Sequence, residues 1–171
     1  MNEQKWDLTR LDNGDLSALR RAAGAPGMDL TALRAFYKAC GYCNPQVERY
    51  WFPMLCMDAL WRTTDHPEIK PMEECLRTLL AGKDDMSESL KHRVDMLLET
   101  PWSEDGFLLG KLLNMVKIIR SKTNLKPDFQ NLADDIRRWN DSGQSVQRRW
   151  VRTVYNVKPE VDEKEEKEHD A

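Results

Sequence analysis

The sequence predicts an all-α protein, a compact bundle of roughly eight helices followed by an acidic C-terminal tail. Gly and Pro are scarce, at 8 residues each, and residues that favour helices dominate. Apolar residues recur every three or four positions in most segments, which is the spacing of an amphipathic helix. No segment alternates between apolar and polar residues as a half-buried strand would, and no internal repeat is visible.

The first two helices are marked by their start and stop residues. Asp15–Ala23 begins with polar residues and stops at Gly24. Asp29 is placed to cap the second helix, Leu30–Cys40. The apolar face of this second helix consists of Leu30, Leu33, Tyr37 and Cys40.

The third helix is longer and rich in aromatic residues. Asn44-Pro45 opens it, and it runs from Gln46 towards Arg62. Pro53 lies inside this segment, where a missing N–H and a bulky ring predict a kink or a break. Two further helices follow, at Pro71–Ala81 and at Ser87–Glu99. In the second of these, the residues in step with the helical period are Leu90, Val94 and Leu97.

The segment Ser103–Lys122 is the most apolar one in the chain. Nine of the fourteen residues from Phe107 to Arg120 are apolar, which predicts a central, buried helix. Helices at Pro127–Asn140 and Gln144–Asn156 complete a single all-helical domain over residues 1–156, or two packed helical halves. Residues 157–171 have almost nothing to bury and are expected to form a disordered acidic tail.

Charge is divided unevenly along the chain. Residues 1–107 hold 13 Lys/Arg and 18 Asp/Glu, residues 108–155 hold 10 and 4, and residues 156–171 hold 3 and 7. A basic helical segment therefore lies beside an acidic tail, although the net charge is only −3. This asymmetry favours a polyanionic partner over a small-molecule substrate.

Two predicted helices present basic residues on one side. On the last helix, Val146, Trp150 and Val154 lie within an arc of about 80° and should face the core. The cations on a separate arc, with no acidic neighbour in the helix, are Arg148, Arg149 and Arg152. On the central helix the polar residues share one side, and they are Gly110, Lys111, Asn114, Lys117 and Arg120. We expect these cations to form one cationic track for phosphates, although a solvated surface explains each helix equally well.

Other cations are weaker candidates for phosphate contacts. Arg20 and Arg21 end an early helix, where cations interact with exposed carbonyl groups. Arg138 follows Asp134 by four residues, a favourable ion-pair spacing. The second-rank candidates are Arg20, Arg21, Arg137, Lys122 and Arg93.

Catalysis, cofactor binding and metal binding have little support in the sequence. Cys40 and Cys43 form a C-x-x-C pair, but Cys40 ends a predicted helix, whereas a redox pair needs its first cysteine at a helix start. Cys56, His66 and Cys75 could complete a zinc site, yet no second ligand pair with zinc-site spacing is present. Buried, reduced cysteines are the simpler interpretation.

The sequence also indicates in which cellular compartment the protein is found. No apolar stretch reaches the ~18 residues that a membrane span requires. The first ten residues, MNEQKWDLTR, lack an apolar signal core. We therefore expect a cytoplasmic protein whose four cysteines are reduced.

Several blocks of the chain resemble one known family, the small subunit of the type I-E CRISPR surveillance complex, Cascade (the CasB family). The opening block is Trp6, Leu11–Leu16 and Leu19–Ala22, and the next is Ala35-Phe36-Tyr37. The late blocks are Ile118–Lys122, Phe129, Leu132–Ile136, Trp139, Val146–Arg152 and Tyr155. The order and spacing of these blocks over most of residues 6–156 carry the resemblance. Leu113 stands where the resemblance suggests a basic residue, and the cysteines and the acidic tail lie outside the pattern.

The resemblance implies a non-catalytic, all-helical subunit that is present as a pair in the complex. It implies contacts with the backbone and large subunits, with the CRISPR RNA, and with the target and displaced DNA strands. Such a subunit lies along the guide–target duplex and helps to hold the displaced strand. Two alternatives remain open, a protein–protein adaptor without nucleic-acid contact and a thiol or zinc protein that uses Cys40 and Cys43.

Overall fold

The computed structural model describes residues 5–24, 29–82 and 87–157. The tail residues 158–171, expected to be disordered, lie outside the described residues. The elements, in chain order, are a 3₁₀ helix η1 (Leu8–Arg10), α1 (Asn13–Ala22), α2 (Leu30–Cys40), α3 (Pro45–Asp58), β1 (Glu68–Lys70), α4 (Met72–Leu80), α5 (Ser87–Glu99), α6 (Phe107–Lys122), β2 (Leu125–Pro127), α7 (Phe129–Arg137) and α8 (Ser145–Val154).

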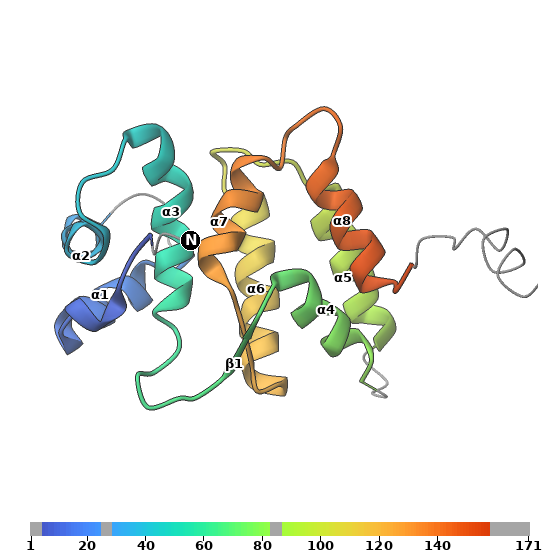
Figure 1. Ribbon diagram of the computed structural model, residues 1–171, viewed down its shortest axis with the longest axis horizontal. Coiled ribbons are helices and arrows are strands. Elements are labelled where there is room, and N and C mark those ends of the chain that lie inside the picture. Colours follow the sequence, from blue (N-terminus) through green and yellow to red (C-terminus); the bar gives the residue numbers. More distant parts are fainter. Residues whose placement is uncertain (1–4, 25–28, 83–86, 158–171) are drawn as a thin grey trace, which may run out of the picture.

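The helices form three groups in space. Figure 1 shows α1, α2 and α3 together on one side, α4, α5 and α8 on the other, and α6 and α7 between them. Helix α3 packs against α7, α4 packs against α8, and α6 contacts α3, α4 and α5. The eight α-helices in the described part confirm the predicted all-α fold.

Two short strands were not predicted. Strands β1 and β2 pair in parallel, with Ile69 opposite Lys126 and Lys70 opposite Pro127. Each strand has only three residues, so neither is long enough to show an alternating pattern. The pair joins the segment before α4 to the segment before α7, and so fixes where both helices begin.

The predicted ends of α2 and α5 match the structure, whereas α3 ends at Asp58 instead of running towards Arg62 and α6 begins at Phe107 instead of Ser103. The side chain of Asp29 accepts a hydrogen bond from the Thr31 amide and caps α2 as expected. Asn44 caps α3 in the same way. Helix α3 is not broken at Pro53, because the helix continues through this residue to Asp58.

The buried face of α2 differs from the predicted one. Leu30 is 78% exposed and Tyr37 is 37% exposed, whereas Leu33 and Cys40 are partly buried against the core, so only half of the predicted face packs inward. The buried residues of this helix are Ala32, Ala35, Phe36 and Ala39. Small side chains let two helices approach closely, and α2 packs this alanine-rich face near α1 and η1.

The core is continuous and centres on α6. The buried residues of this helix are Leu108, Leu112, Leu113, Met115, Val116 and Ile119. This confirms that α6 is a central, buried helix. The tryptophans Trp139 and Trp150 pack edge-to-face with ring centroids 5.1 Å apart, and both are almost fully buried. Their burial agrees with a role in the core rather than in base stacking.

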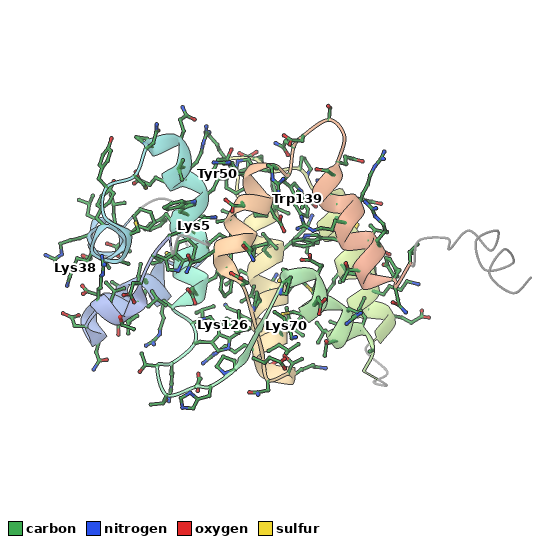
Figure 2. The ribbon with its side chains drawn as sticks, viewed as in Figure 1. Lys5, Lys38, Tyr50, Lys70, Lys126 and Trp139 are labelled. Atoms are coloured by element: carbon green, nitrogen blue, oxygen red, sulfur yellow. The ribbon has the colours of Figure 1, made fainter. Side chains whose placement is uncertain are left out.

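Two ion pairs link α1, α2, α3 and β2. Lys38 of α2 pairs with Asp15 of α1, and Lys126 of β2 pairs with Asp58 at the end of α3. Asp58 also accepts a hydrogen bond of 2.8 Å from the Trp6 indole. Both lysines are labelled in Figure 2. Each pair places a cation beside a buried carboxyl group, which offsets the cost of its burial.

A second ionic cluster joins α4, α7 and α8. The guanidinium of Arg149 contacts the carboxylates of Glu73, at 3.2 Å, and Asp135. Asp135 also accepts a hydrogen bond of 3.1 Å from the Trp150 indole. Glu73 and Asp135 are both buried, at 8% and 6% exposure. We call this cluster the α4–α7–α8 clip.

Removal of the Arg149 side chain should destabilise the fold. Arg149→Ala removes the cation of Glu73 and leaves Asp135 with the more distant Arg138, at 3.7 Å. We expect a loss of only about 2 kcal/mol of unfolding free energy, since the Arg149 guanidinium is partly exposed. The matched control is Arg148→Ala, which removes an exposed arginine outside the clip and should cost less than about 0.5 kcal/mol. Urea unfolding followed by circular dichroism measures both values. Equal stability of the two variants would show that the clip contributes nothing.

Candidate nucleic-acid interface

The polar side of α6 is the best-defined cationic surface in the described part of the chain. Leu112, Met115 and Ile119 bury the opposite faces of the helix in the core. Consequently, the predicted polar residues emerge together on one side. Asn114, Lys117 and Arg120 are exposed, and Gly110 and Lys111 are partly buried. We call this set the α6 strip.

The three cations of the α6 strip differ in the partners that they contact. Lys111 donates a hydrogen bond of 2.6 Å to the Thr100 hydroxyl, which fixes its direction but leaves its charge uncompensated. Lys117 and Arg120 form no ion pair with any carboxylate among the described residues. Two neighbouring cations without a counter-ion repel each other, and an anion bound between them relieves this repulsion.

A groove lies between α5 and the first part of the α6 strip. It has a volume of about 520 Å³. Its lining residues are His92, Arg93 and Met96 of α5 and Lys111, Asn114, Met115, Lys117 and Ile118 of α6. The lining includes one histidine, one arginine and two lysines but no Asp or Glu. We call it the α5–α6 groove.

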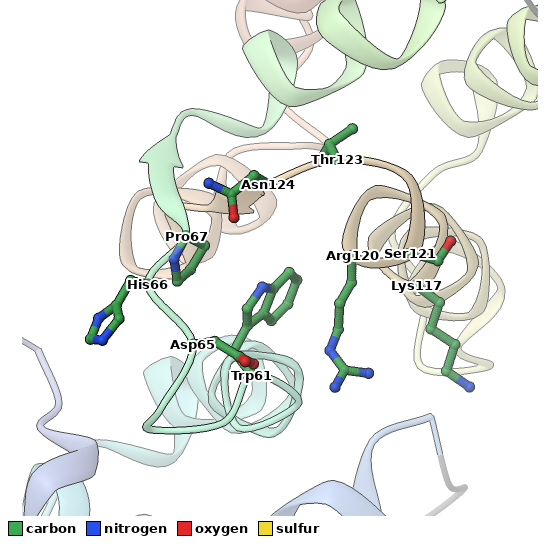
Figure 3. A pocket seen from close by; sticks show the side chains of 9 residues that line it. All are labelled: Trp61, Asp65, His66, Pro67, Lys117, Arg120, Ser121, Thr123 and Asn124. Atoms are coloured by element: carbon green, nitrogen blue, oxygen red, sulfur yellow. The ribbon is translucent and has the colours of Figure 1, made fainter.

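A second, smaller groove of about 350 Å³ begins where the first one ends. Figure 3 shows Lys117 and Arg120 projecting from α6 on one side, His66 and Pro67 on the other, and Trp61 between them. The remaining lining residues are Asp65, Ser121, Thr123 and Asn124. Lys117 lines both grooves, so the two form consecutive sites along α6.

The arginines of α8 do not extend the α6 strip. Helix α8 itself carries no acidic residue, but Arg149 is bound to Glu73 of α4 and Asp135 of α7, so it is not an unpaired cation of the expected track. Arg148 and Arg152 are exposed but line a different groove, between α5 and α8, which also contains Asp95 and Glu99. Helix α5 contributes residues to both grooves and separates them. The cations of α6 and α8 therefore do not form the expected single cationic track. They lie on two separate surfaces, and the groove beside α8 also contains carboxylates, from Asp95 and Glu99, whereas the α5–α6 groove contains none.

The second-rank cations are scattered. The Arg20 side chain donates a hydrogen bond of 2.6 Å to the carbonyl of Ala59, at the end of α3, which is a structural role. Arg93 joins the α5–α6 groove. Arg21, Arg137 and Lys122 are exposed at other places on the helices. The spacing of residues in the sequence did not indicate that Met96 and Trp61 line these grooves. Their positions in the grooves depend on contacts between distant segments.

Two other sequence expectations change in the structure. Arg138 lies 3.7 Å from Asp135 instead of pairing with Asp134, which contacts Lys5. Leu113, where the resemblance suggests a basic residue, is buried beside Gly24 rather than exposed on the α6 strip. A Cβ atom added at Gly24 would lie 2.3 Å from a Leu113 methyl group. A leucine at this position therefore serves packing.

The cysteines lie in apolar or hydrogen-bonded surroundings. Burial raises the pKa of Cys40, Cys56 and Cys75 to about 12, and it also raises the pKa of Cys43. Cys40 is the last residue of α2, as predicted, and its thiol donates to the Phe36 carbonyl. A thiol with a raised pKa is a poor nucleophile and a poor metal ligand near neutral pH.

The described residues offer neither a metal site nor a membrane-spanning helix. Among them, no group of three or more His, Cys, Asp or Glu side chains could hold a metal ion. Within the same residues, no helix has the length and apolar character needed to cross a membrane.

Comparison with known proteins identifies relatives in sequence and in structure. Residues 15–155 match the family of CRISPR-associated protein Cse2. CasB of M. ruber has a TM-score of 0.67 and 21% identity, over 86% of this chain and 87% of that chain. A Cse2-family protein from Thermus thermophilus has a TM-score of 0.66 and 23% identity, over 88% and 94% of the two chains.

A third similar structure is a chain of a CRISPR RNA-guided surveillance complex. Its TM-score is 0.65 at 21% identity, over 85% of this chain and 86% of that chain. The comparison with curated proteins gave no significant match. At these identities the structural similarities show that the fold is shared.

The raised thiol pKa values predict slow alkylation. At pH 8 the thiols of Cys40, Cys56 and Cys75 in the folded protein should react with iodoacetamide about 100-fold or more slowly than those of the unfolded protein, because very little thiolate is present, and Cys43 should also react more slowly. Mass spectrometry of the labelled peptides measures each cysteine separately. Rapid labelling of Cys40 or Cys43, or zinc in the purified protein that a Cys43→Ser variant loses, would instead support the thiol or zinc alternative.

Proposed function

The chain belongs to the CRISPR-associated protein Cse2 family, and from this premise we propose that it is a non-catalytic small subunit of a type I-E CRISPR RNA-guided surveillance complex, Cascade. It contributes to antiviral defence in the cytoplasm by binding nucleic acid along the α6 strip. The observation that carries the proposal is that Lys117 and Arg120 are exposed, have no described carboxylate partner and line consecutive grooves.

Binding through the α6 strip is independent of base sequence. Lysine and arginine recognise backbone phosphates, and such contacts fix register and orientation without reading bases. In a guide-directed complex, sequence is read by base pairing between the guide RNA and the target strand. The exchange of one duplex for another is nearly balanced in free energy, so phosphate contacts from a protein can stabilise the open state. We assign this stabilising role to the chain, on the guide–target duplex and on the displaced strand.

The groove between α5 and α8 suits a protein partner better than a nucleic acid. It combines exposed apolar side chains, Val151 and Val157, with carboxylates as well as arginines. Burial and a hydrogen bond to Asp95 raise the pKa of Tyr155 to about 12, so its hydroxyl stays protonated at this edge. We propose that this face contacts another subunit of the complex or a second copy of the chain. In this proposal, the protein–protein contact of the adaptor alternative is made by the groove between α5 and α8, and the α6 strip binds nucleic acid.

Charge reversal on the α6 strip tests the proposed function. If the strip and its neighbours neutralise about four phosphates, log affinity falls with log salt at a slope of roughly −3 to −4. Lys117→Glu with Arg120→Glu should reduce the magnitude of this slope by about 2 and weaken DNA binding. The isolated wild-type chain should bind with a dissociation constant of roughly 10⁻⁴ to 10⁻⁶ M at physiological salt.

The control for this experiment changes the net charge equally but elsewhere. Arg10→Glu with Arg34→Glu reverses two exposed arginines on η1 and α2, outside both α6 grooves. Fluorescence anisotropy with DNA measures the isolated chains, and target-strand opening measures the reconstituted complex. Arg149 is unsuitable for such a test because its reversal would break the α4–α7–α8 clip. An identical loss in the two double variants would contradict a specific role for the α6 strip.

Removal of the acidic tail tests the alternative that it masks the basic surface. The described chain ends at Val157, which lines the groove between α5 and α8 rather than the α6 strip. If the tail does not mask the α6 strip, deletion of residues 158–171 should change DNA affinity by less than about twofold at physiological salt, where exposed charges more than about 8 Å apart are largely screened. A much larger gain in affinity, measured by the same titration, would support masking by the tail.

A further inference from the structure

We propose that the α5–α6 groove holds an unpaired nucleobase, so that this face of the protein binds single-stranded nucleic acid in preference to duplex. The inference rests on the proposed function and adds to it, because phosphate contacts alone do not distinguish the two forms. It depends on the combination of an apolar floor with a cationic rim in one groove.

The floor of the groove is apolar and adaptable. Three apolar residues line it: Met115 is 1% exposed, Ile118 is partly buried, and Met96 of α5 is 41% exposed. A methionine thioether is polarisable and makes favourable contacts with aromatic rings. Two methionines and an isoleucine therefore form a surface on which a flat aromatic base of any sequence can pack.

The rim of the groove is polar and cationic. Arg93, Lys111 and Lys117 surround the floor, and Lys111 is already held in place by Thr100. The exposed amide of Asn114 carries both donors and an acceptor, so it can hydrogen-bond the edge of any base. By contrast, the groove between α5 and α8 contains Asp95 and Glu99, which repel phosphate. Of these two grooves, the α5–α6 groove is the one that matches an anionic ligand.

The dimensions of the groove suit a nucleotide rather than a duplex. Its volume of about 520 Å³ lies within the ~300–1,000 Å³ of small-ligand sites. The bases of a duplex are stacked and paired, so a duplex offers only phosphates to the rim and leaves the floor empty. A single strand can place one base on the floor while its flanking phosphates contact Arg93 and Lys117.

The decisive experiment removes the bases but keeps the phosphates. The wild-type chain is titrated with an oligodeoxythymidylate strand, with an abasic strand of the same length and with a duplex of the same length. The abasic strand loses the contacts of a base with the methionine sulfurs and with Ile118, so we expect it to bind at least about twofold more weakly than the thymidylate strand. Equal affinity for these two strands would overturn the inference.

A variant that fills the groove locates the effect. Asn114→Leu places a branched side chain in the α5–α6 groove without changing charge, so it should abolish the difference between thymidylate and abasic strands and preserve the salt slope. The matched control, Asn13→Leu, makes the same substitution at an exposed residue of α1 and should leave the difference intact. A difference that persists in Asn114→Leu would place the base elsewhere and overturn the assignment to this groove.

The outcomes separate this inference from the proposed function. If no strand binds at any salt concentration tested, the proposed function fails and the inference fails with it. If all three nucleic acids bind with a steep salt dependence and equal affinity, the proposed function stands and the inference alone is wrong.

Discussion

The buried carboxylate of Asp135 is the interaction on which the C-terminal half of the structure depends. An ionised group in the core is costly unless charged or hydrogen-bonding partners surround it. Asp135 obtains them from α8, through the Arg149 guanidinium and the Trp150 indole. These contacts set both the rotation and the height of α8 against α7, and Glu73 extends the same constraint to α4. The direction in which the other α8 side chains point follows from this arrangement.

The same constraint explains which cations remain for binding. Buried carboxylates take up Arg149, Lys38 and Lys126, although none of these is distinguished in the sequence from cations at the surface. No buried carboxylate lies beside Lys117 or Arg120 in the described part of the chain. A basic segment of sequence is thus divided by the fold into cations that support the structure and cations that are free to bind.

The sequence predicted what depends on neighbouring residues and missed what depends on distant ones. Ser87–Glu99 and Leu30–Cys40 were predicted at their observed limits because start and stop signals act within one helical turn. The contact of Arg149 with Glu73 joins residues 76 positions apart, and no local pattern could indicate it. Helical periodicity gave the angular position of Lys117 on α6, but only the packing of α5 and of the segment around Trp61 turned that position into a site. The outward leucine of α2 shows that hydrophobicity alone does not determine which face is buried.

The position of Lys117 at the junction of the two α6 grooves has a consequence for regulation by modification. Acetylation of a lysine removes its charge and its capacity to bind phosphate. Because this one side chain borders both grooves, its acetylation would weaken two adjacent sites in a single step. The loss would be transmitted without any change of backbone conformation, since the side chain forms no ion pair with the described residues that hold the fold. Under the proposed function, a single covalent modification of Lys117 would therefore weaken the binding of a nucleic-acid strand while the fold stays intact.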